Sequence, residues 1–333
     1  MSRSTASAPQ QQAKKQASPS GSSAGAAALR RKRRWAKIWN CRTAYLMLIP
    51  CLVSLLLFNY LPMFGLQIAF KNYRLAYTIS EATWVGLKWF RQFFASAQCL
   101  RVVKNTLSIS LMTLIVGFPL PILLALIINE LRSRRMKKTL QTVTYMPYFV
   151  SSVIIVTLVT TIFGSNGVVN SLRMQFGADS PLLFMQDSKW FKPIYMLMGI
   201  WQYTGYDAIV FVGAMAAIPP ELYEAALIDG AGRFSRMWHI TVRCIMPTIA
   251  TMFILKVGKI MNLMWQQILL MQNDLNIGVS EVIQTYVYKR GIESADYSFA
   301  TAVGMLTSLF SLVLIVSTNY ITKKMSDNEV SVF

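Results

Sequence analysis

Six long apolar segments alternate with polar ones along the chain, and each is long enough to cross a bilayer. They cover about residues 44–68, 105–129, 140–163, 193–217, 247–270 and 299–321. A transmembrane helix needs roughly 20 predominantly apolar residues. The pattern therefore predicts an all-α polytopic membrane protein with six transmembrane helices.

The polar segment between the fourth and fifth apolar segments has the signals of two short helices. Pro219–Pro220 stops the preceding helix, and Glu221–Ile228 combines good helix formers with early acidic residues. Gly230–Gly232 breaks that helix, and Arg233–Ile245 can form a second one before Pro247 opens the next span. Because both flanking segments cross the membrane, this pair of helices is expected to lie on a membrane surface and to contact another protein.

The remaining polar segments carry weaker signals. Residues 1–29 are rich in Ser, Ala, Gln and Pro, which predicts disorder. Trp84–Gln98 mixes aromatic residues with Lys88 and Arg91, which favours an interfacial amphipathic helix. The segment after the third span reads as an irregular loop with a short helix near Val168–Gln175.

Basic residues fix the expected orientation. The tail, the 130–138 loop, the 218–246 loop and the C-terminus together hold twenty Lys and Arg residues, whereas the three opposite loops hold eleven. Loops on the cytoplasmic side carry the excess of Lys and Arg. Both termini and the 218–246 loop are therefore expected to face the cytoplasm.

Composition supports a membrane protein and excludes several classes. Of the 333 residues, 54% are hydrophobic and 14% are charged, whereas soluble domains carry about 25% charged residues. The net charge of +19 is explained by the basic loops and the run at Arg30–Lys37, so no nucleic-acid partner is expected. A single histidine and four unpaired cysteines argue against a metal site, a disulfide framework and a Ser/His/Asp triad. No phosphate-binding GxxxxGK[ST] loop is present, so the chain is not expected to be an enzyme.

Charged and polar residues inside the spans are the candidate substrate-path residues, because such groups are costly in a bilayer. In the fourth and fifth segments they are Trp201, Tyr203, Tyr206, Asp207, Lys256, Lys259, Asn262 and Gln266. Spacings of three, three and four predict that the last four share one helical face. Two interpretations remain open: the face lines a hydrated path for a polar or anionic solute, or it packs against other helices with a lysine paired to Asp207.

The 218–247 segment resembles the EAA loop of ATP-binding cassette (ABC) importer permeases. It has Glu224-Ala225-Ala226, then Gly230, Ile240 and Pro247 at the family spacing, and Asp229-Gly230-Ala231 matches the form seen in sugar permeases. The chain departs from the pattern at Val242-Arg243, where the family has Leu-Pro, and this leaves the shape of the second loop helix open.

A second motif resembles the oligosaccharide branch of that family. It runs from Asn59 to Gly65 (NYLPMFG), followed by Ile68-Ala69-Phe70 and Tyr73. Within the branch, the permeases of bacterial alginate-oligosaccharide importers are the nearest resemblance. Lys256 and Lys259 would suit an acidic sugar chain without establishing one.

The resemblance implies a type I importer fold in the bacterial cytoplasmic (inner) membrane and a set of partners. These are a second permease subunit, expected to be a non-identical homologue, two ATPases that bind ATP and Mg, a solute-binding protein outside the membrane, an oligosaccharide and membrane lipid. The chain itself would bind no cofactor. The ATPase would dock on the EAA loop through Glu224, Ala225, Ala226, Asp229 and Gly230.

The implied domain boundaries place a disordered tail at 1–29, a basic pre-membrane segment at 30–43, the permease domain at 44–325 and a cytoplasmic tail at 326–333. Two other function classes compete with the importer permease. One is an ion-coupled secondary transporter that uses Asp207, Lys256 and Lys259. The other is a membrane scaffold whose loop recruits a soluble partner.

Overall fold

The computed structural model describes residues 41–76 and 78–325, and most of these residues are helical. Three helical stretches are long and apolar enough to span a bilayer, namely Arg42–Phe70, Ala97–Glu130 and Tyr297–Lys324. Three further pairs of helices are long and apolar enough when each bent pair is taken as one span. The number of spans is then six, as the apolar pattern predicts. The expectations for the tail at 1–29, the basic residues up to 40 and the segment 326–333 lie outside the described residues.

The chain divides into two compact units, one ending at Phe64 and one beginning at Gly65. The described part of the first unit is α2 (Arg42–Leu55), η1 (Leu56–Tyr60) and the start of η2 (Leu61–Phe70). Its large apolar side chains are exposed, as expected of a helix whose surroundings are lipid or other membrane helices.

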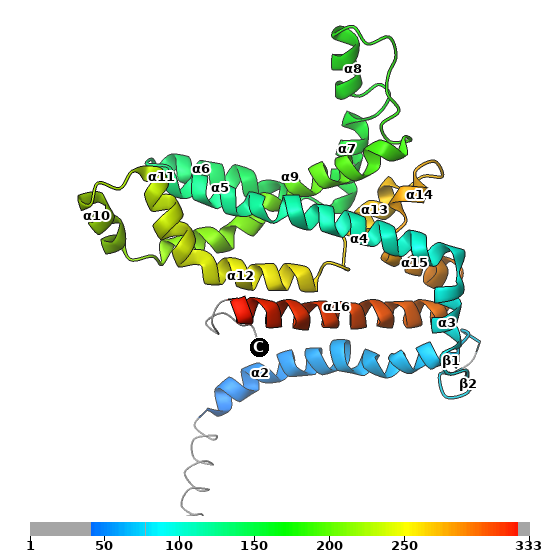
Figure 1. The fold of residues 1–333 in the computed structure, drawn as a ribbon. Helices are drawn as coiled ribbons and strands as arrows, with labels where there is room; N and C mark the ends of the chain where they lie inside the picture. The colour runs from blue at the N-terminus through cyan, green and yellow to red at the C-terminus, as the bar shows by residue number, and fades with distance from the viewer. Residues whose placement is uncertain (1–40, 77, 326–333) are drawn as a thin grey trace, which may run out of the picture. The chain divides into compact units, whose positions relative to one another are not determined.

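Long helices of the second unit form its bundle (Figure 1). The second span consists of α4 (Ala97–Gly117) and α5 (Pro119–Glu130), and Pro119 opens α5 at the first helical position, where a proline costs no hydrogen bond. Both pack on α9 (Ser188–Ala216), and α12 (Arg243–Gly258) packs on α16 (Tyr297–Met325). The central contact of α5 with α9 buries Leu126 and Phe211.

The third apolar segment does not form one straight helix. It contains α6 (Arg134–Tyr145), η3 (Met146–Phe149) and α7 (Ser152–Ile162), and the chain turns by 99° between η3 and α7. Pro147 lies in the turn of η3, and the Ser151 hydroxyl accepts the amide of Ile154 at 3.4 Å to start α7. A proline followed by a serine N-cap therefore interrupts this span.

The fifth apolar segment is also interrupted, so one continuous helix over 247–270 is wrong. Helix α12 ends at Gly258, and α13 (Trp265–Met271) begins after a break of six residues. A Cβ atom at Gly258 would lie 2.7 Å from Ile315 Cδ1, so a larger residue there would have to displace the Ile315 side chain where α12 meets α16. In the break, Ser110 Oγ donates to the carbonyl of Ile260 and Gln284 Nε2 donates to that of Met261. Other helices thus supply hydrogen bonds that the broken helix lacks, which is the condition for irregular backbone at membrane depth.

The end of this unit opposite α10 (Pro220–Ile228) carries short elements (Figure 1). Strands β1 (Lys71–Asn72) and β2 (Thr83–Trp84) pair antiparallel, and α3 (Lys88–Ala95) follows them. The amphipathic helix expected over Trp84–Gln98 is therefore shorter than predicted, because Trp84 belongs to a strand and Ser96 is extended. Its Trp89 and Phe93 are buried in the protein core, where they pack with Phe299.

The remaining short helices lie in the connections between the spans. The helix expected near residues 168–175 is confirmed as α8 (Val168–Gln175). Between the fifth and sixth spans lie α14 (Ile277–Ser280), α15 (Ile283–Tyr288) and the π-helical η5 (Lys289–Glu293).

Candidate functional site

The EAA loop begins with α10, which the prolines predict. Pro220 is the first residue of α10, and Glu221 lies in its first turn near the positive end of the helix dipole. The helix ends at Ile228, and Gly230 adopts a positive φ of 77° that reverses the chain. The amide of Ala231 donates to the carbonyl of Ala226 at 2.9 Å and completes this cap.

The surface of this loop is unusually apolar for an exposed segment. Ile228 is 87% exposed and Phe234 is 83% exposed, and Leu227 and Trp238 are exposed as well. Glu224 lies among them with its side chain exposed, and Ala225 next to it presents only a methyl group. Glu221 and Asp229 are exposed as well. A group of large exposed apolar residues is typical of a protein interface.

The second loop helix is not separate from the fifth span, which corrects the expectation for Arg233–Ile245. Helix α11 (Arg233–Arg236) continues through the π-helical η4 (Met237–Val242) into α12, and the path bends by 61°. Arg243 stands where the family pattern has proline, and its amide donates to the carbonyl of Ile240. A proline has no such amide, so the departure from the pattern allows the hydrogen-bonded backbone to continue here.

Within the spans, Lys256 and Asp207 form an ion pair. Lys256 Nζ lies 3.0 Å from Asp207 Oδ2 and 3.5 Å from the carbonyl oxygen of Gly117, where α4 ends. About a third of each charged side chain is exposed. The interpretation that pairs a lysine with Asp207 is therefore confirmed for Lys256, and the two charges compensate each other inside the bundle.

Beside this pair lies a polar and aromatic cluster. The ring of Tyr148 stacks on Tyr206 with centroids 3.7 Å apart and meets Tyr203 edge to face. The buried amide of Gln267 donates to Gln202 Oε1 at 2.7 Å and to the Tyr203 hydroxyl at 3.3 Å. Two interrupted spans, through η3 and α13, thus meet α9 at one place.

Sequence reasoning missed three residues of this cluster, Tyr148, Gln202 and Gln267. Tyr148 lies in the sequence Met-Pro-Tyr-Phe-Val-Ser-Ser, whose Pro and Ser residues mark the bend. That signal was sufficient to suggest an interrupted span. Trp201, by contrast, lies on another face of α9 than the cluster. It is two residues before Tyr203, and residues at that spacing do not share a helix face.

The predicted common face of Lys256, Lys259, Asn262 and Gln266 is wrong, because α12 ends at Gly258. Lys256 points into the bundle toward Asp207, whereas Lys259, Asn262 and Gln266 are exposed along the break and the start of α13. Lys259 follows the last helical residue, where a cation is favourable at the negative end of the helix dipole. None of the ion pairs found among residues 41–76 and 78–325 includes Lys259.

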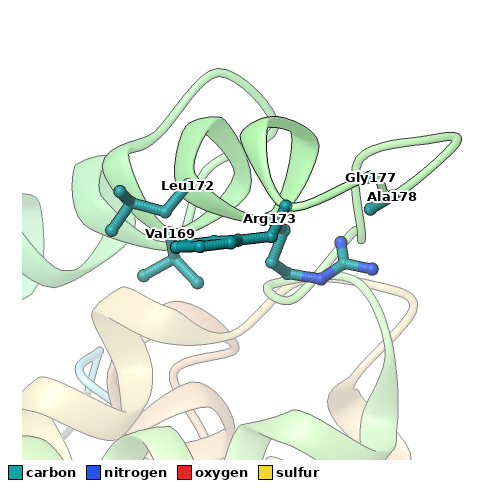
Figure 2. Close-up of a pocket in the computed structure, with 6 residues that line it drawn as sticks. Val169, Leu172, Arg173, Gly177 and Ala178 are labelled. Carbon is teal, nitrogen blue, oxygen red and sulfur yellow. The ribbon is translucent and has the colours of Figure 1, made fainter.

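A hollow of about 520 Å³ lies beside α8, lined by apolar side chains and the guanidinium group of Arg173 (Figure 2). Asn170 organises this segment: its side-chain amide donates to the carbonyls of Gly164 and Leu182 at 2.9 Å, and its oxygen accepts the amide of Leu182. The hollow is open and contains no group from the spans.

An α-helical membrane bundle with a polar cluster inside it and an exposed two-helix loop at one end defines a membrane transport subunit. The sequence profile of the family described as "Binding-protein-dependent transport system inner membrane component" matches residues 117–327, and the chain belongs to this family. It is therefore a permease subunit of an ABC importer and not itself an enzyme. The ion-coupled alternative is not favoured.

Two curated relatives from Bacillus subtilis (strain 168) are similar over most of their length. Protein LplB is 42% identical over 84% of this chain and 88% of its own length. The polygalacturonan/rhamnogalacturonan transport system permease protein YteP is 39% identical over 90% of this chain and 93% of its own length.

Solved structures share the fold. A bacterial ABC transporter involved in the import of the acidic polysaccharide alginate has a chain that is 38% identical, with a TM-score of 0.80 over 88% of this chain and 99% of that one. A second structure contains the alginate transporter in complex with a pentasaccharide-bound periplasmic protein, and its chain matches with a TM-score of 0.81 over 90% of this chain and 100% of that one.

Proposed function

We propose that this permease carries an acidic oligosaccharide, supplied by a solute-binding protein, along a path that passes the break in the fifth span. The observation that carries the proposal is that Lys259, Asn262 and Gln266 are each exposed at that break or at the start of α13. An unpaired cation with two amide side chains suits carboxylate and hydroxyl groups. The names of YteP and of the alginate transporter, which refer to acidic polysaccharides, support the same substrate class.

The aromatic cluster belongs to the same proposal. Tyr203 and Tyr206 offer rings of the kind that stack on sugars, and Tyr148 packs against both. Trp201 lies outside this cluster, and its exposed ring is a separate candidate for the path. The Asp207–Lys256 pair has no net charge, so it adds hydrogen-bonding groups without attracting an anion by itself. Lys259 is thus the residue expected to distinguish acidic from neutral sugars.

The power source is proposed to be a pair of ATPases that hold ATP and Mg and dock on the EAA loop. Glu224 would bind a basic residue of the ATPase, while Ala225, Ala226, Asp229 and Gly230 allow close approach. The exposed Ile228 and Phe234 supply apolar contact area for such a partner. A second permease subunit, a non-identical homologue, would complete the path.

We infer in addition that the EAA loop and both termini face the cytoplasm, on the strength of the Lys and Arg distribution. Cysteine placed at Phe234, in a variant without the four native cysteines, is expected to react with a membrane-impermeant reagent only when the cytoplasmic side is accessible. Labelling from the outside of sealed cells would overturn this orientation.

The proposed function is tested by uptake into vesicles that contain the assembled complex. ATP is supplied on the side of the membrane that carries the ATPases, and the solute-binding protein and sugar are supplied on the opposite side. Under these conditions ATP is expected to drive uptake of a uronate oligosaccharide. Uptake driven by a proton or sodium gradient without ATP would contradict the proposal. The absence of uptake from a fully assembled complex would instead favour the scaffold role.

Lys259→Ala is expected to weaken transport of a uronate oligosaccharide by about tenfold, because a hydrogen bond to a charged group is lost. Transport of a neutral oligosaccharide of the same length should change less than about twofold. The measurement is the concentration dependence of uptake for both sugars. Lys323→Ala, which removes an exposed lysine at the end of α16, is the matched control. An equal loss for both sugars would leave Lys259 only a packing role.

A further inference from the structure

Helix α10 is attached to the rest of the protein by very little packing. None of its residues is buried, and only Tyr223 and Ala226 are partly covered. The polypeptide connects α10 to the bundle at both ends of the helix. In addition, the Tyr223 hydroxyl of α10 forms a hydrogen bond with Thr241 Oγ1 at 2.9 Å. A movement of α10 therefore reaches the bundle through few contacts, and this bond is one of them.

Thr241 lies between the loop and the fifth span. It is fully buried and belongs to η4, the π-helical turn that directly precedes the 61° bend of the fifth span. Such turns are rare and occur frequently at functional sites. The neighbouring Val242 packs on the core cluster that contains Phe211 and Ile245. Because this packing holds η4 against the core, a displacement of Thr241 is expected to move α12, into which η4 continues.

The same helix leads from Thr241 to the intramembrane ion pair. Lys256 is fifteen residues further along, or roughly 22 Å at 1.5 Å per residue. The bond from Tyr223 to Thr241 therefore links α10 to the helix that carries Lys256, its pair with Asp207 and the break beyond Gly258.

A second contact holds the other end of the loop and is weaker. The Arg233 guanidinium donates to Glu130 Oε2 at 3.1 Å and to the Glu130 carbonyl, at the end of α5. The Arg233 side chain is 57% exposed, and ion pairs in solvent contribute little. The hydrogen bond of Tyr223, by contrast, ends on a fully buried residue, Thr241.

We propose that Tyr223 is a positioning residue for coupling: it transmits the movement of α10 to the fifth span through Thr241. The proposal rests on the proposed docking of an ATPase on α10. It assigns Tyr223 a role separate from docking, because its hydroxyl points toward the bundle and Glu224 is exposed to the partner.

The test separates assembly from coupling in Tyr223→Phe, which removes only the hydroxyl. Co-purification of the ATPase and basal ATP hydrolysis are expected to be unchanged. Stimulation of ATP hydrolysis by the sugar-loaded binding protein is expected to fall about fivefold, the effect of one neutral hydrogen bond, and uptake with it. Tyr320→Phe, at an exposed tyrosine of α16, is the matched control and should retain full stimulation.

Variants of the partner side chain complete the test. Thr241→Val should reproduce the loss, Thr241→Ser should restore stimulation, and Thr251→Val, on the exposed side of α12, is the control. The double variant of Tyr223→Phe and Thr241→Val should be no worse than either single variant. Full stimulation in Tyr223→Phe with normal assembly would overturn the role of Tyr223. Normal assembly in Glu224→Lys would instead contradict ATPase docking on α10.

Discussion

Glu224→Lys is expected to reduce association of the ATPase by at least about 100-fold and to abolish ATP-driven uptake. Glu224 is exposed on α10 among large apolar side chains, so a lysine there would face the same partner surface with the opposite charge. Like charges brought together at an interface cost several kcal/mol. The measurements are co-purification of the ATPase at increasing salt and uptake by reconstituted vesicles.

The control for this charge reversal is Glu293→Lys, at an exposed residue of η5. It makes the same chemical change outside the EAA loop and should leave association and uptake intact. Both variants should insert normally, because neither residue is buried. Uptake at the wild-type rate in Glu224→Lys would refute the docking role of Glu224.

Gly205→Val is expected to destabilise the folded protein by more than about 3 kcal/mol. A Cβ atom at Gly205 would lie 2.0 Å from the carbonyl oxygen of Thr144 and 2.4 Å from its carbonyl carbon. These are backbone atoms of α6, so α6 and α9 would have to separate. Close approach of two helices at a small residue is a main source of packing energy in membranes. The apparent melting temperature of the purified protein should fall by roughly 6–12 °C.

Gly199→Val on the same helix is the matched control, because an added Cβ there meets no atom within 4 Å. It should change the melting temperature little, since valine has at least the helix propensity of glycine. A comparable loss of stability in both variants would show that valine in α9 is harmful for a reason unrelated to Thr144.

The number of spans was predictable, and Pro147 and Ser151 mark the bend in the third span, but the break in the fifth span was not predictable. The length of an apolar segment can be read directly from the sequence, and this sequence has six segments long enough to cross a bilayer. The break after Gly258 receives hydrogen bonds from Ser110 and Gln284, and Gly258 itself lies against Ile315. All three residues are far away in the sequence. A local pattern cannot contain these contacts. The helical spacing from Lys256 to Gln266 therefore suggested a continuous face that the protein does not have.

The EAA loop was predictable for a different reason. Prolines before α10 and glycines after it act on the local backbone, so the helix appears at the expected residues. Asp207 could be recognised as a costly intramembrane charge, and Lys256 was one of two candidate partners. Tyr148 and Gln267 required the fold, because the turn of η3 and the restart at α13 bring them to α9.

The break in the fifth span has a consequence for how the protein is made. Ser110 is synthesised well before Ile260, but Gln284 is synthesised after Met261. While the ribosome is still adding residues beyond Met261, one carbonyl of the broken segment lacks its final donor. The fifth segment can therefore leave the insertion machinery in its final form only when the chain has grown past Gln284. The fifth segment is thus expected to reach its final fold only after the connection to the sixth span has been synthesised.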